Sequence, residues 1–120
     1  MGNRAVVSFG TTPSAKAVYL HWNGGRASVE GFLRACALLH LPPTRESLYG
    51  VAKGYLGRSC YLETVGTSDR DNYDNGWYVL ERGEWRIRER KFNRLSEEID
   101  EEKTRAITIE CLMMWWGWQN

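Results

Sequence analysis

Residues 17–33 read AVYLHWNGGRASVEGFL, and this stretch decides the fold because it joins a strand, a turn and a helix start. Residues 17–22 favour extended structure, and the run stops at Asn23-Gly24-Gly25, where the chain reverses at little conformational cost. Ser28 then has the chemistry of a helix N-cap. Apolar residues follow at helical spacing, at Val29, Phe32, Leu33, Cys36 and Leu39. The pattern predicts a strand followed directly by an amphipathic helix from Ser28 to about His40.

The segments on either side supply a second strand and a second helix. Residues 4–9 alternate weakly, and a loop at residues 10–14 would pair them antiparallel to the strand at residues 17–22. Prolines 42 and 43 stop the first helix, and Thr44 is a suitable N-cap for the next one. This second helix contains three glycines at near-helical spacing, Gly50, Gly54 and Gly57. They either allow close packing against a neighbour or mark a helix that frays, and we favour close packing.

Three more strands follow, at residues 59–67, 77–81 and 84–90, the last two joined by a turn at Arg82-Gly83. Near the carboxyl end, Ser96 and the acidic residues after it are typical of a helix start. Beyond Ala106 the pattern fits a strand or a continued helix, and a helix would group Ala106, Ile109, Met113 and Trp116 on one side. We predict a single α+β domain over residues 1–120, with an antiparallel sheet of about five strands, two helices inserted after the second strand and a helix at the carboxyl end.

Composition narrows the class of protein. The 120 residues carry a net charge of +1, which argues against a strongly basic nucleic-acid binder. Three widely spaced cysteines without a CxxC pair predict neither a disulfide scaffold nor a zinc site and fit a reduced cytoplasm. The amino end lacks the apolar core of a signal peptide, and the longest apolar run, residues 111–116, is too short to span a bilayer. We expect a protein of the bacterial cytoplasm.

No pattern in the sequence predicts catalysis. His21 and His40 have no evident nucleophile beside them, so we expect no enzyme and no cofactor. The Asn23-Gly24-Gly25 turn with Arg26 could cradle a phosphate, although it lacks the further glycines or Lys-Ser/Thr of nucleotide loops. Residues 68–76 resemble a calcium loop only in composition, because that register places a tyrosine and an arginine at ligand positions. We therefore expect no metal.

Three groups of residues are candidates for binding a partner. The first is acidic and lies in one loop, at Asp69, Asp71 and Asp74. The second lies on the polar face of the strand at residues 84–90, opposite Trp85 and Ile87, and consists of Arg86, Arg88 and Arg90. The third is aromatic and follows two methionines, at Trp115, Trp116 and Trp118. Such apolar area is normally buried, and the core, a homodimer interface and a partner's groove all remain open.

The chain also resembles a family of small proteins of bacteriophages and integrative elements. The resemblance rests on Asn3–Gly10 (NRAVVSFG), Tyr19–Gly25 (YLHWNGG), Ser28–Leu33 (SVEGFL) and Asp74–Val79 (DNGWYV). It covers roughly residues 3 to 92, and the carboxyl-terminal quarter departs from the family. Most members have no assigned activity. Because small phage proteins without catalytic motifs are often inhibitors of host defence, the resemblance implies a protein that binds a host CRISPR–Cas component, as anti-CRISPR proteins do.

Two other functions stay open. A small nucleic-acid-binding accessory protein would use four basic residues with Trp85 or Phe92, namely Arg86, Arg88, Arg90 and Lys91. Its binding would weaken steeply as salt rises. A protein that sequesters a small signalling nucleotide would use the Asn23-Gly24-Gly25 turn. Neither function needs a catalytic residue.

Overall fold

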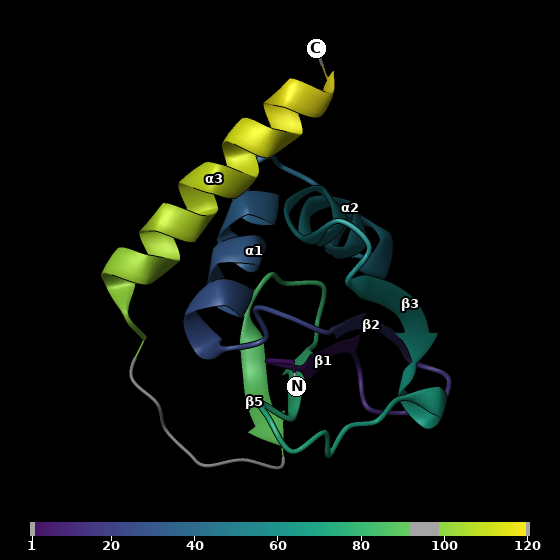
Figure 1. The fold of residues 1–120 in the computed structure, drawn as a ribbon. Coiled ribbons are helices and arrows are strands. Elements are labelled where there is room, and N and C mark those ends of the chain that lie inside the picture. Colours follow the sequence, from purple (N-terminus) through teal and green to yellow (C-terminus); the bar gives the residue numbers. More distant parts are fainter. Residues whose placement is uncertain (1, 92–98, 120) are drawn as a thin grey trace.

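The centre of the molecule is a five-stranded mixed sheet with strand order β3-β2-β1-β4-β5 (Figure 1). The computed structural model describes residues 2–91 and 99–119, except for the side chains of residues 89–91, 118 and 119. The elements in chain order are β1 (Ala5–Phe9), β2 (Lys16–Leu20), α1 (Arg26–Leu38), α2 (Arg45–Leu56), β3 (Cys60–Thr64), the 3₁₀ helix η1 (Val65–Thr67), β4 (Trp77–Leu80), β5 (Ile87–Lys91) and α3 (Glu101–Gln119). The predicted α+β class with a helix at the carboxyl end is confirmed, whereas the order of strands and helices differs slightly from the prediction.

One strand pair differs from the predicted antiparallel sheet. The pairs β1–β2, β2–β3 and β4–β5 are antiparallel, whereas β1 and β4 are parallel. After β3 the chain passes through η1 and residues 68–76 to reach the other side of β1. Parallel neighbours require such a crossover connection, and this one shows no helical or strand periodicity from which its path could be predicted.

The two faces of the sheet are covered differently. Small and branched side chains of one face meet the apolar faces of α1 and α2, and the largest buried side chains there include Phe32, Leu20 and Tyr78. On the opposite face, Val65 of the crossover packs with Val6 and Trp77. The molecule therefore has helices on one side of the sheet and irregular chain on the other.

The helix starts support one sequence prediction and correct another. Thr44 caps α2, and its side-chain oxygen accepts a hydrogen bond from the Ser47 N–H at 3.3 Å. In α1 the N-cap is Gly25, so Ser28 lies inside the first turn, and the helix ends at Leu38, short of His40. His40 instead takes a positive φ of 56°, which terminates the helical path.

The structure also decides the remaining uncertain boundaries of strands and helices. The predicted strand at residues 59–67 stops at Thr64 and continues as η1, and the predicted strand at residues 84–90 begins only at Ile87. Residues 101–119 form one continuous helix, so the strand alternative after Ala106 is wrong. The Asp100 carboxylate accepts from the Lys103 N–H at 3.1 Å at the helix start. Ser96, the predicted start, lies outside the described residues.

Helix α3 packs against α1 and α2 rather than on the sheet (Figure 1). The two helices approach closely at Gly31 of α1, where an added Cβ would lie 2.7 Å from Ile107 Cγ2. The sequence predicted close packing at Gly50, Gly54 and Gly57, which is wrong for at least two of them, and Gly57 lies just past the end of α2 as its C-cap. A Cβ on Gly50 would have an ordinary contact at 3.6 Å, and one on Gly57 would meet nothing within 4 Å.

Candidate functional site

Backbone and side-chain hydrogen bonds bring together three segments that lie far apart in the sequence. The Gly24 N–H donates to the Asn3 carbonyl at 2.8 Å, and the Tyr78 hydroxyl donates to the Gly24 carbonyl at 2.9 Å. The Asn75 N–H donates to the Arg4 carbonyl at 3.0 Å. A Cβ on Gly24 would lie 2.6 Å from the Asn3 carbonyl, so glycine is required by this packing. These contacts connect the amino end, the turn before α1 and the start of β4.

The same contacts occupy the groups that a phosphate cradle or an acid–base site would need. Gly24 already uses its N–H, and Arg26 forms an ion pair with Glu30 one turn along α1. The His21 ring shares a hydrogen bond at 2.7 Å between its Nδ1 and the Tyr19 hydroxyl. Burial raises the pKa of Tyr19 above its usual value, although Arg4 opposes the shift. The polar groups of these residues already bond to other parts of the protein, so they are not available to a ligand.

The acidic loop divides into structural and exposed members. Both the backbone N–H and the Nε of Arg4 donate to Asp74 Oδ2, at 2.9 and 2.8 Å, and these bonds lower the pKa of Asp74. Asp69 and Asp71 are exposed. Of the three predicted acidic residues, Asp74 holds the amino end of the chain, and the other two are available to a partner.

Asn72 organises this loop and was missed by the sequence reasoning. It is fully buried, and its amide donates to the carbonyls of Asp69 and Gly76, each at 3.1 Å. Its side-chain oxygen accepts from the N–H groups of Asp74 and Gly76 at 3.3 and 3.0 Å. An Asn ahead of an Asp-Asn-Gly turn is a known local signal for such bonding, but composition alone does not distinguish it from its exposed neighbours.

The basic strand has the predicted division between its faces where side chains are described. Trp85 and Ile87 pack against the core, whereas Arg86 and Arg88 are exposed. Arg88 forms an ion pair with Glu84. The side chain of Arg90 lies outside the described part of the structure. Arg86 and Arg88 are therefore exposed as predicted, and Glu84, which precedes β5, neutralises part of their charge.

The terminal aromatic residues divide between core and surface. Trp115 packs against the core cluster, whereas Trp116 is 55% exposed. Met113 is 64% exposed and Ile109 49%, and with Trp116 they follow the spacing i, i+4, i+7 of one helix face. We call Ile109, Met113 and Trp116 the α3 apolar face. The side chain of Trp118 is among those that the structure does not describe.

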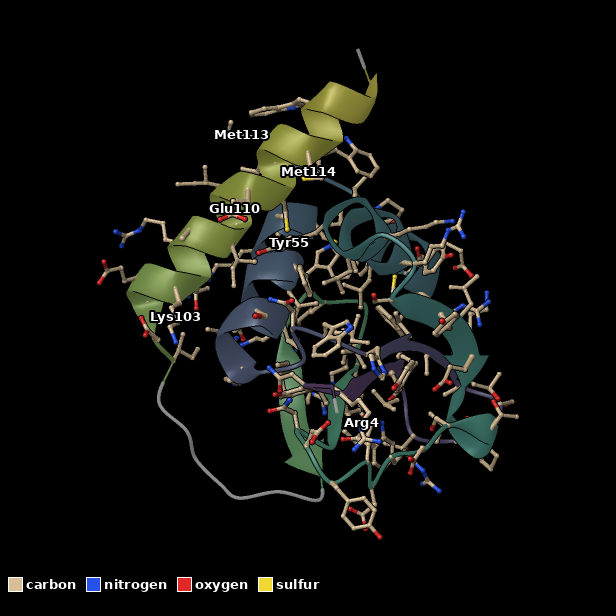
Figure 2. All side chains as sticks on the ribbon, in the orientation of Figure 1. Arg4, Tyr55, Lys103, Glu110, Met113 and Met114 are labelled. Atoms are coloured by element: carbon tan, nitrogen blue, oxygen red, sulfur yellow. The ribbon has the colours of Figure 1, made fainter. Side chains whose placement is uncertain are left out.

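The α3 apolar face lies opposite the packed side of the helix. Thr104, Thr108 and Cys111 are buried toward α1 and α2, and Figure 2 shows Met113 on the side of α3 turned away from these helices. Earlier on the exposed side, the helix carries Glu102 and Arg105. The exposed side thus changes from charged to apolar along the helix. The sequence grouped Ile109 and Met113 correctly for a helix but did not select them as candidates.

A cavity of about 420 Å³ lies between α2 and the carboxyl-terminal half of α3. Two glycines of α2 and the C-cap Gly57 contribute to its lining, so they leave space at this position rather than bringing the helices together. The full set of lining residues is Gly50, Val51, Lys53, Gly54, Gly57, Arg58, Cys111 and Trp115. This cavity was not predicted, because it depends on how α3 crosses α2.

The three predicted groups do not form one surface. In Figure 1 the last turns of α3 project past α1 and α2 at the top, whereas β5 and the chain after β3 lie at the bottom. A partner that covers the α3 apolar face would therefore not reach all of the predicted charged residues.

Comparisons of the chain with models of protein families, with curated proteins and with solved structures found no match. None of the helices in residues 2–91 and 99–119 combines the length and the apolar character needed to cross a membrane.

Proposed function

We propose that this chain is a phage or mobile-element protein that inhibits host defence by binding one host protein. The most concrete form is an anti-CRISPR inhibitor that covers a surface of a CRISPR–Cas component and blocks interference sterically. The observation that carries the proposal is the α3 apolar face, where Ile109, Met113 and Trp116 are about half exposed or more. The sequence resemblance implies a phage or mobile-element protein, and the α3 apolar face is the surface through which it would bind its partner.

The geometry of the face fits one mode of recognition. Anchors at i, i+4 and i+7 on one helix are the pattern by which an amphipathic helix enters a partner's hydrophobic groove. Trp is enriched among interface residues that contribute most to affinity, and Met adapts to irregular surfaces. Because the last turns project beyond α1 and α2, a groove can close around them without meeting the sheet (Figure 1).

A second copy of the chain is the other occupant to consider for this face. Two α3 helices pairing across a twofold axis would bury the same three side chains. A homodimer of this kind would compete with binding of the host protein. Sedimentation of the purified chain decides between them, because a dimer lost on substitution of Met113 and Trp116 with glutamate would assign the face to self-association.

Nucleic-acid binding is the alternative function, and one observation favours it. Arg86 is exposed and forms no ion pair within the described residues, so it is free to contact a phosphate. Arg88, by contrast, is paired with Glu84. One exposed arginine without an ion pair on this side, on a chain of net charge +1, gives weak electrostatic attraction, so we place this function second.

The test is binding to purified CRISPR–Cas effector complexes of several types, after nuclease treatment and at two salt concentrations. We expect one complex to bind the wild type stoichiometrically, with little effect of salt. Met113→Glu with Trp116→Glu should weaken binding at least a hundredfold, since the loss of two anchors costs about 3 kcal/mol or more. Arg86→Glu with Arg88→Glu is the matched control on another surface. If this control alone abolishes binding, or if binding requires nucleic acid, the proposal is overturned.

A further inference from the structure

We propose that the cavity between α2 and α3 binds a small amphipathic anion, a carboxylate attached to an apolar body. The site is separate from the α3 apolar face, because Cys111 and Trp115 line the cavity from the packed side of α3. Its volume of about 420 Å³ falls within the range of small-molecule sites, which are concave, mostly apolar and carry few polar groups. The inference does not depend on the proposed function.

The residues that line the cavity favour a ligand with an apolar body. Val51, Cys111 and Trp115 supply aliphatic, thiol and aromatic surface from two helices. Burial raises the pKa of the Cys111 thiol to about 12, so the group stays neutral and acts as an apolar wall rather than a nucleophile. Gly50 adds no side chain at a point where a Cβ would contact Trp115 Cζ3 at 3.6 Å. The space beside the indole is therefore open to a flat or chain-like apolar group.

The charges at the cavity select an anion. Lys53 and Arg58 line it and are exposed, and no acidic residue is among the lining residues. The Lys53 ammonium lies 5.3 Å from the centre of the Tyr49 ring, and Arg58 forms no ion pair in the part of the chain that the structure describes. Burial, and then the nearby carboxylate of Glu110, raises the pKa of the Tyr55 hydroxyl, and Glu110 does not line the cavity (Figure 2). Two cations without a carboxylate partner in the site would hold a carboxylate at the solvent-facing side.

The test uses 1-naphthoate as the probe and 1-naphthalenemethanol, which has the same ring system without the charge, as its neutral counterpart. Both are titrated into ¹⁵N-labelled protein and followed by two-dimensional NMR. We expect saturable shifts for naphthoate at the Gly50 and Gly54 amides and the Trp115 indole N–H. The neutral compound should bind at least tenfold more weakly.

Two variants locate the binding. Lys53→Gln with Arg58→Gln should reduce naphthoate affinity at least tenfold and bring it close to that of the neutral compound. Lys103→Gln with Arg105→Gln removes two exposed cations of α3 that do not line the cavity, and affinity should not change. Gly50→Leu fills the space beside Trp115 and should abolish the shifts, while its spectrum reports whether the fold is kept.

Three results would overturn the inference. The first is the absence of saturable shifts with the wild type. The second is equal affinity for the charged and the neutral compound, and the third is shifts that persist in a folded Gly50→Leu protein. None of these results bears on binding of a defence protein through the α3 apolar face.

Discussion

Glu63 on β3 has an unusual environment for a carboxyl group. Burial, and then the nearby charge of Asp69, raises its pKa to about 7, and its buried Oε2 atom has no hydrogen-bond partner among the described residues. In the unfolded chain the same group has its ordinary pKa near 4.5. The folded state therefore holds the proton more tightly, and the protein loses stability as the pH rises from the unfolded toward the folded value.

Substituting Glu63→Gln should consequently stabilise the protein at about pH 8 and have much less effect at about pH 4, where the wild-type carboxyl is protonated in the folded state. Thermal unfolding at the two pH values measures the difference. Glu46→Gln is the control of opposite sign, because a backbone hydrogen bond and Arg45 lower the pKa of Glu46. Equal effects of Glu63→Gln at both pH values would show that Glu63 is not desolvated.

Asn72 is a buried polar residue that stabilises the protein through its hydrogen bonds. Asn72→Ala removes four hydrogen bonds within the loop before β4 and leaves backbone groups unsatisfied, so we expect a loss of about 3 kcal/mol in the free energy of unfolding. Asp71→Ala, at the exposed neighbouring position, should change it by less than about 0.5 kcal/mol. Urea unfolding of both variants measures this. Similar small losses for the two would contradict the structural role of Asn72.

The contact between α1 and α3 depends on a glycine. A Cβ at Gly31 would lie 2.7 Å from Ile107 Cγ2 and 2.9 Å from Ile107 Cβ, so Gly31→Ala should destabilise the protein by about 1–3 kcal/mol. Adding Ile107→Ala to this variant should recover part of the loss.

Gly50→Ala provides the matched control on α2. Its Cβ meets only an ordinary contact, so it should stabilise the helix by about 0.5–1 kcal/mol. If both glycine variants stabilised the protein in urea unfolding, α3 would not pack against α1 as described.

The elements that the sequence predicted well are those with local causes. The Asn23-Gly24-Gly25 turn, the Thr44 cap and the alternation of Trp85 and Ile87 with arginines each follow from neighbouring residues. Val65 was assigned to a strand because it continues the period-two pattern, but it begins η1 and is buried against the sheet. The parallel β1–β4 pair and the role of Gly31 depend on contacts between distant residues, which no local pattern encodes.

The candidate site was predicted only in part for a similar reason. An exposed Trp116 and a packed Trp115 are indistinguishable in sequence until the position of α3 against α1 and α2 is known. Asp74 was grouped with Asp69 and Asp71 by composition, although its bonds to Arg4 give it a structural role. Charge reversal in the acidic loop should therefore be confined to Asp69 and Asp71, since reversing Asp74 would also disturb the amino end.

At the scale of the whole molecule, the core and the projecting end of α3 have separate roles. The core maintains the fold, and the end of α3 would bind the proposed partner. The sheet, α1 and α2 form the core, and the α3 apolar face lies at the end of the molecule away from β5 (Figure 1). Because Met113 and Trp116 are mostly exposed, replacing both with glutamate should change the free energy of unfolding by less than about 1 kcal/mol. A loss of binding in this variant would then report on the surface and not on folding.

The most direct measurement is phage plating on a panel of bacterial strains, each with one CRISPR–Cas type targeting the phage, that express the chain or a variant. We predict that the wild type restores plaque formation on one targeted strain. The Met113→Glu, Trp116→Glu variant should fail to do so at equal protein level, and the Arg86→Glu, Arg88→Glu variant should behave as wild type. Restoration by the α3 variant, or no restoration by the wild type on any strain, would contradict inhibition of CRISPR–Cas interference through the α3 apolar face.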